Sequence, residues 1–304
     1  MDAGPPTPQG RAAALSRRWR LTPWLFLAPA LLPGAIFYLL PVLVSVLLSL
    51  AEWDALTPPR WVGWSNYAYL LGVDPLFQRT LGNTFIFAVG SAALGVPLAL
   101  AIAWAMQGAR LQPFWRVVHW LPMVTNAVAI AYAWRFVLDP ADGILNHLLG
   151  IAGLEGPEWL GSPATAMLSV VLVAGWTSLG QNILLFSIGL GQVDSRLWDA
   201  ARLDGAGPLR MFWSITLPML RPTLLFTTIT SLINGLGSFA LILLLTGGGP
   251  AGSTDVTALY FYRMAFEHLR MGRASAAATV LFLLIMVLTL IQLRLLRRGG
   301  LDGW

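Results

Sequence analysis

The charged side chains best placed to do chemistry lie in one polar stretch between two long apolar segments. Asp199 and Arg202 are three residues apart, and Asp204 and Gly205 follow directly. Side chains three apart share one face of a helix, so this acid and base can pair there. A charged helix between apolar segments provides a surface to which a soluble partner protein can bind. We therefore expect residues 192–220 to form an attachment loop rather than a catalytic site.

Catalytic and metal-binding patterns are missing from the sequence. It has no Cys, and its three His residues, His119, His147 and His268, are isolated and have no metal-ligand spacing. The Gly-rich run at 246–250 lacks the Lys-Ser/Thr pair of a nucleotide-binding loop. An intramembrane enzyme needs a nucleophile–base pair or a metal cluster. We expect a chain that is not an enzyme and binds no metal or cofactor.

Composition places the chain in a membrane. Of its 304 residues 57% are hydrophobic and only 11% are charged, against about 25% charged in soluble domains. A membrane-spanning helix takes about 20 mostly apolar residues. Six segments qualify, at roughly 23–50, 81–107, 117–138, 164–190, 222–245 and 274–294. The sequence predicts an all-α polytopic membrane protein with six transmembrane helices.

The basic residues predict an orientation. All 19 are Arg, and 13 of them lie in the N-terminal tail, near residue 110, in the 192–220 loop or directly after it at Arg221, and in the C-terminal tail. The positive-inside rule therefore places both termini and this loop in the cytoplasm. We expect a cytoplasmic tail at 1–20 and one transmembrane domain at 21–298, surrounded by lipid. No basic face suggests a nucleic-acid partner.

The local sequence predicts a helix–turn–helix within the polar loop. Ser195 is expected to cap a short helix over 196–204, and Gly205 to end it in a left-handed conformation. Pro208 suits the first turn of a second helix. An amphipathic connector that rests on lipid headgroups would have a similar pattern.

The same stretch resembles the coupling loop of permease subunits of ATP-binding-cassette importers, whose pattern is E-A-A-x3-G-x9-I-x-L-P. The matching positions are Asp199, Ala200, Ala201, Gly205, Ile215, Leu217 and Pro218. Asp199 in place of Glu is the one departure, and its shorter side chain changes the reach of that contact. The resemblance implies that the loop docks on a cytoplasmic ATPase subunit, with Arg202 and Asp204 as auxiliary contacts.

Shorter motifs extend the resemblance along the chain. Those at 61–67, 83–84, 121–122, 134–135 and 139–146, and above all Thr-Gly-Gly-Gly-Pro at 246–250, are similar to the first permease subunit of maltose- and glycerol-3-phosphate-type importers. The resemblance implies a bacterial inner-membrane location and four partners. They are a second homologous permease, two ATPase subunits that use ATP and Mg²⁺, and an extracytoplasmic sugar-binding protein. It implies import of a sugar, or a related polyol or glycerol phosphate, by alternating access.

Polar and aromatic side chains inside the apolar segments are candidates for the substrate path, because sugars are bound through hydroxyl hydrogen bonds and aromatic faces. They are Asn126, Trp176, Thr177, Gln181, Asn182, Asn234, Ser238 and Phe239. The alternative is hydrogen bonding and packing between helices. Asn182 and Asn234 lead, because their segments flank the polar loop.

Two other functions remain open. One is the same importer class with a non-sugar cargo. The other is an ion-coupled secondary transporter, which usually carries buried Asp, Glu or His on its path. If the first and last residues of the six segments are set aside, His119 and Arg135 are the ionisable residues that remain, and both lie close to a segment end rather than in its middle.

Overall fold

The computed structural model describes residue 24 and residues 26–107 and 112–299. The predicted tail at 1–20 lies outside these residues. The regular secondary structure of the described chain is helical except for one small antiparallel hairpin, β1 (Ala51–Glu52) with β2 (Arg60–Trp61). The all-α expectation is therefore confirmed for the part of the chain that the structure describes.

Within the described residues, four helices are long and apolar enough to cross a bilayer. They are Phe26–Leu48, which contains the π-helix η1 (Ala35–Leu39) and α2 (Leu40–Leu48), then α4 (Pro75–Ala105), α8 (Ala166–Gly191) and α15 (Met271–Gly299). Each coincides with one of the apolar segments predicted from sequence. Asp74 caps α4 by accepting from the backbone N–H groups of Leu76 and Phe77.

The other two apolar segments are not continuous helices. Residues 117–138 divide into α5 (Gln112–Val124) and α6 (Ala127–Val137), and the path of the chain bends by 108° between their apolar parts. The chain turns there because Asn126 is extended and caps α6 by accepting from Val128 N–H at 2.8 Å. Residues 222–245 divide into α12 (Arg221–Leu236) and α13 (Ala240–Leu245), with residues 237–239 outside both helices.

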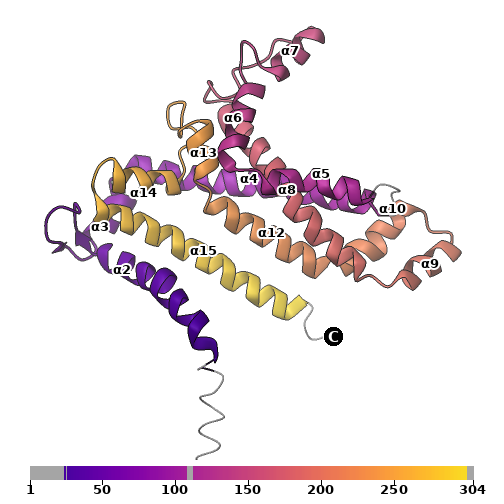
Figure 1. The fold of residues 1–304 in the computed structure, drawn as a ribbon, viewed down its shortest axis with the longest axis horizontal. Coiled ribbons are helices and arrows are strands. Elements are labelled where there is room, and N and C mark those ends of the chain that lie inside the picture. The colour runs from indigo at the N-terminus through magenta and orange to yellow at the C-terminus, as the bar shows by residue number, and fades with distance from the viewer. Residues whose placement is uncertain (1–23, 25, 108–111, 300–304) are drawn as a thin grey trace, which may run out of the picture.

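The bundle is built on α4, with α8 and α12 packed against it (Figure 1). Glycines allow the close approach: a Cβ at Gly235 of α12 would lie 2.7 Å from the Cα atom of Ala88 of α4. α15 packs on α12, on α2 and on α14 (Thr257–Phe266). Buried side chains such as Phe87, Val170 and Leu259 form one core, and a second core includes Leu100 and Phe186.

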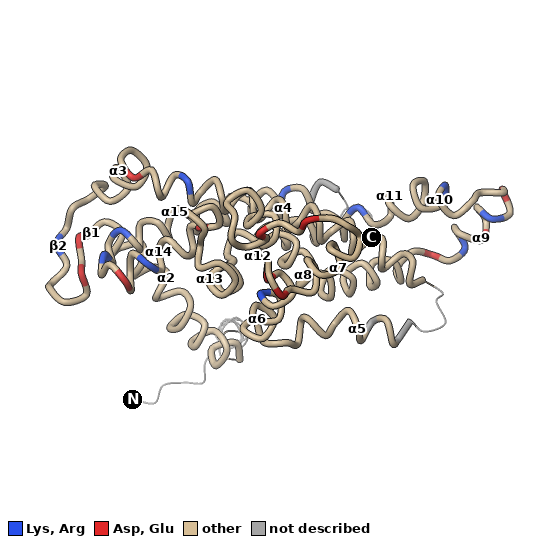
Figure 2. The backbone as a smooth tube through the Cα atoms, turned by 90° about the horizontal axis from the view of Figure 1, so that it is seen from above, with Lys and Arg blue, Asp and Glu red and all other residues tan. Residues whose placement is uncertain are grey.

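Charged residues are sparse along the long helices and gather in the segments that join them (Figure 2). One end of the bundle carries the hairpin and α3 (Ser65–Gly72). The opposite end carries α9 (Ser195–Leu203) and α10 (Pro208–Met211), and α15 runs toward that end (Figure 1). α7 (Ile144–Ile151) stands away from the bundle beyond α6.

Candidate functional site

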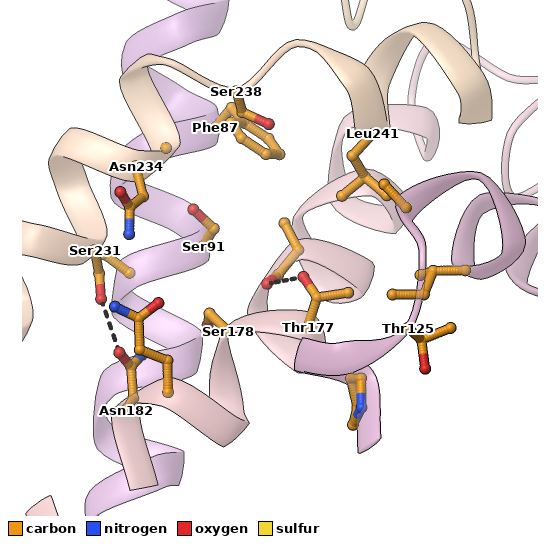
Figure 3. A pocket seen from close by; sticks show the side chains of 17 residues that line it. Phe87, Ser91, Thr125, Thr177, Ser178, Asn182, Ser231, Asn234, Ser238 and Leu241 are labelled. Carbon is orange, nitrogen blue, oxygen red and sulfur yellow. Dashed lines mark hydrogen bonds between the residues drawn. The ribbon is translucent and has the colours of Figure 1, made fainter. Parts of the chain in front are cut away.

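A cavity of about 340 Å³ lies where α4, α8 and α12 meet the bend between α5 and α6 (Figure 3). Both helix interruptions border it, because Thr125 lies in the first and Ser238 in the second, and Ala127 of α6 and Leu241 of α13 also line the cavity. Backbone that leaves helical geometry inside a membrane is tolerated where it is buried in protein or lines a cavity. The two breaks and the cavity therefore form one feature.

The polar side chains reach the cavity by helical periodicity. Ser231 and Asn234 of α12 are three residues apart, which places them on one side of the helix, and Ser238 follows in the break after α12. Ser178 and Asn182 of α8 are four residues apart and share a side in the same way. Ser231 donates a hydrogen bond to the Asn182 Oδ1 atom at 3.3 Å, which ties α12 to α8 (Figure 3).

Asn182 has an unused donor. Its side chain is 4% exposed, and its Nδ2 atom is buried with no hydrogen-bond partner among the described residues. A buried polar group left without a partner costs about 1–3 kcal/mol. Because Asn182 lines the cavity, an acceptor inside the cavity would remove that cost.

The structure gathers five of the eight sequence candidates around this cavity: Thr177, Gln181, Asn182, Asn234 and Ser238. The other three have packing or capping contacts instead. Asn126 caps α6, the Trp176 ring meets that of Trp134 edge-on at 5.4 Å, and the Phe239 ring lies 4.9 Å from that of Tyr262. Substrate contact stays a prediction for all eight.

Sequence reasoning missed four polar residues of the cavity wall, which are Ser91, Thr125, Ser178 and Ser231. Three of them had a usable signal. Ser178 and Ser231 lie one helical turn from Asn182 and Asn234, and Thr125 precedes the candidate Asn126. Ser91 is a lone hydroxyl among apolar residues of α4, and its Oγ atom donates to Ala88 O, so sequence gave no sign of its place.

In the 192–220 loop the first helix begins one residue earlier than predicted. Asp194, not Ser195, is its N-cap, because Asp194 is extended and its side chain accepts from Arg196 N–H at 2.9 Å. Ser195 is already helical. The pair predicted between Asp199 and Arg202 forms at 3.2 Å, with side chains 67% and 63% exposed. Gly205 has φ +74°, the left-handed conformation predicted for it.

The two halves of this loop differ in burial. Ala200, Asp204 and Gly205 are exposed at the α9 end. The second half continues through the π-helix η2 (Phe212–Thr216) and α11 (Leu217–Met219), where Ile215, Leu217 and Pro218 are half-buried. Leu217 and the buried Leu220 pack on the core formed by α4 and α8. Movement of α9 would therefore reach these helices through residues 212–220.

The glycine-rich loop at 246–256 is closed by internal contacts. Asp255, 3% exposed, accepts from the Nη1 atom of Arg263 at 3.0 Å, and Arg263 also donates to Gly247 O. Asn83 of α4 donates to the carbonyls of Gly252 and Asp255 at 3.0 and 2.9 Å. Burial raises the pKa of the Asp255 carboxyl, and the charges of Arg263 and Arg79 oppose that shift.

A sequence model of the family described as "Binding-protein-dependent transport system inner membrane component" matches residues 95–299. The chain belongs to this family. It is the membrane permease component of an ATP-binding-cassette importer, in which the ATPase is a separate subunit, and not an enzyme. This identity agrees with the coupling-loop pattern found in its sequence.

Curated relatives match along almost the whole chain. The probable ABC transporter permease protein YurN of Bacillus subtilis is 35% identical over 92% of this chain and 97% of its own length. The lactose transport system permease protein LacF of Rhizobium radiobacter is 32% identical, covering 92% and 94%. The sn-glycerol-3-phosphate permease UgpA of Agrobacterium fabrum is 30% identical, covering 92% and 96%.

Solved structures show the same fold. A chain of a bacterial transporter that imports the acidic polysaccharide alginate superposes with a TM-score of 0.79 at 24% identity, covering 94% of this chain and 98% of that one. A second structure of an alginate transporter, in complex with an alginate pentasaccharide-bound periplasmic protein, also gives a TM-score of 0.79, at 23% identity and covering 94% and 96%.

Proposed function

We propose that this chain is the first of two homologous permease subunits of a bacterial sugar importer. Both termini and the 192–220 loop lie in the cytoplasm, and residues 1–20 form a cytoplasmic tail. Counted with α5–α6 and α12–α13 as one broken span each, the chain crosses the membrane six times. Two ATPase subunits use ATP and Mg²⁺, and this chain binds no cofactor.

The observation that carries the proposal is the polar cavity at the two helix breaks. Transporters commonly place their substrate near the bilayer midplane, where interrupted helices leave polar groups facing the path. Here hydroxyl and amide groups from α4, α8 and α12 surround one cavity, and Asn182 holds an unused donor. These groups suit the hydroxyls of a sugar, which both donate and accept hydrogen bonds.

The comparisons support the cargo class and the binding protein. LacF and UgpA are named for lactose and sn-glycerol-3-phosphate, and one structural match contains a pentasaccharide-bound periplasmic protein. We infer a mono- or oligosaccharide, or a related polyol or glycerol phosphate, delivered by an extracytoplasmic sugar-binding protein. The second permease supplies the facing wall of the path.

In this mechanism the 192–220 loop transmits force. ATP binding closes the paired ATPases and moves α9, with Asp199 as the leading contact and Arg202 and Asp204 beside it. Residues 212–220 pass that movement to α4 and α8, because Leu217 and Leu220 pack on them. The pathway then opens outward to take sugar from the binding protein, and ATP hydrolysis resets it. ATP drives the switch only through different affinities for the two states.

The test is sugar uptake by the complete importer in proteoliposomes with Asn234→Leu in this chain. Losing one substrate hydrogen bond of about 1 kcal/mol lowers uptake about fivefold to tenfold, with subunit assembly unchanged. Thr289→Val is the matched control, because Thr289 lies on α15 and donates to its own helix at Ile285 O. Full uptake by Asn234→Leu would show that Asn234 packs between helices and does not contact the substrate.

A further inference from the structure

The cavity wall carries no ionisable side chain among the described residues that line it. Nine of the 17 lining residues have a hydroxyl or amide side chain, and the other eight are apolar or glycine. Several hydroxyls already donate to backbone carbonyls of their own helix, such as Thr177 to Ala174 O at 2.8 Å and Ser178 to Gly175 O at 2.8 Å. These hydroxyls have no second proton to donate, so toward a ligand they act as acceptors.

We infer that the part of the cargo that occupies this cavity is uncharged, so this importer carries a neutral sugar and rejects phosphorylated, sulfonated and uronic acid sugars. The inference rests on the proposed function and narrows its cargo class. It separates this chain from two of the proteins it resembles, UgpA and the alginate importer, whose names state anionic cargo.

The physical reason is the cost of an uncompensated charge in an apolar bundle. A carboxylate or phosphate that leaves water needs a cation or several converging N–H donors in place of its hydration shell. Among its described residues the wall offers no Arg or His, and its side-chain N–H donors are limited to the neutral amides of Gln181, Asn182 and Asn234. A neutral hydroxyl meets no such penalty, because it donates to hydroxyl and amide oxygens and accepts from an amide such as that of Asn182.

Arg263, which lies after the last lining residue in the sequence, is not available to bind an anion. Arg263 is committed to Asp255 at 3.0 Å, to Gly247 O, and to Glu267 at 3.9 Å. It holds the glycine-rich loop that follows α13, whose residue Leu241 lines the cavity.

The test measures uptake and cavity occupancy together. The complete importer with its own binding protein is reconstituted in proteoliposomes and given ATP with lactose or raffinose as neutral probes, or digalacturonate or sn-glycerol-3-phosphate as anionic probes. The chain has no Cys, so Ser91→Cys gives it a single thiol in the cavity wall for N-ethylmaleimide. Thr289→Cys on α15 is the control thiol.

We expect a neutral probe to accumulate at least tenfold faster than either anionic probe and to slow labelling of Ser91→Cys but not of Thr289→Cys. An anionic probe that accumulates and protects Ser91→Cys would overturn the neutral-cargo inference and leave the proposed function standing. Uptake of any probe without protection of Ser91→Cys would show that the cavity is off the path. Uptake of no probe would overturn the proposed function itself, and the inference with it.

Discussion

The two polar loops that border α12 and α13 are built in opposite ways. In the loop at 246–256 the Asp255 carboxylate and the backbone carbonyls are held from within the chain, by Asn83 of α4 and by Arg263 of α14. In the loop at 192–220 the α9 charges face outward, and Leu203 at its end is 90% exposed. The loop at 246–256 is held by other parts of its own chain, whereas the α9 end of the loop at 192–220 is folded but exposed.

The difference indicates which loop needs a partner to be complete. Exposed apolar side chains rimmed by charges are typical of surfaces that meet another protein. On this loop Leu203 is joined by Leu209 and Trp213, which are 67% and 64% exposed. Damage to the 246–256 loop should therefore lower the stability of the chain, whereas damage to the α9 end should lower transport and leave stability unchanged.

The largest effect is expected for Arg263→Ala. It strands the Asp255 carboxyl, 3% exposed, without its ion pair. Removing one partner of a buried pair costs about 3 kcal/mol, at the low end of the usual range because Arg263 is partly exposed. Thermal unfolding of the purified chain in detergent measures the loss. Arg270→Ala, an exposed arginine nearby, is the control, and equal unfolding temperatures for the two variants would show that the loop is not closed by this pair.

Gly205→Val should have the next largest effect, on transport rather than stability. Gly205 has φ +74°, where a β-branched residue is strained by roughly 2 kcal/mol, so the turn after α9 would be displaced. No steric clash contributes, because a Cβ there meets nothing within 4 Å. We expect proteoliposome uptake to fall at least tenfold with the unfolding temperature within error of the wild type.

Gly207→Val provides the matched control for that turn. Gly207 has φ −73°, which any L residue adopts, and a Cβ there also meets nothing within 4 Å. Normal uptake is expected for it. If the two variants lost uptake equally, bulk at this surface rather than the turn conformation would be responsible.

A smaller effect is expected in the pH dependence of stability. The pKa of Asp255 is raised in the folded chain, mainly by burial, so the folded state holds the proton more tightly than the unfolded state. The stability from this group is complete below the ordinary Asp pKa of about 3.9 and is lost as pH rises through the folded value. Asp255→Asn removes this dependence. As pH rises through the acid range, the unfolding temperature of the wild type should therefore fall relative to that of Asp255→Asn. Parallel curves for the two chains would contradict the raised pKa.

Sequence predicted the continuous spans but not the breaks, for a physical reason. Length and apolarity alone define α4, α8 and α15. The break at Asn126 depends on a side-chain cap, and the break after Leu236 has three residues that read as apolar or small. Neither break has a strong turn signal in the local sequence. Both lie in apolar segments, where composition alone predicts a continuous helix and the turn depends on tertiary packing.

Some of the polar residues that line the cavity could be predicted from the sequence and others could not, for a related reason. Asn182 and Asn234 are polar residues in apolar segments that flank the 192–220 loop, so the sequence singles them out. A serine satisfies its own donor within its helix, as Ser91 and Ser178 do, and therefore looks ordinary. Asn126 and Trp176 have the residue types of a binding site, but in the structure Asn126 caps α6 and Trp176 makes an edge-on ring contact.

The smallest stability effect, and the finest test of the two-loop comparison, belongs to Asp199→Ala. The Asp199–Arg202 pair is mostly exposed, and exposed helix pairs contribute about 0.2–0.5 kcal/mol. The unfolding temperature should therefore stay within error. Retention of the ATPase subunit during copurification should fall several-fold, because the acid is the first position of the coupling pattern. Asp142→Ala, an exposed acid just after α6, should change neither quantity. Unchanged ATPase retention would show that Asp199 is not a docking contact, whereas a lower unfolding temperature would show that α9 is held by its own chain after all.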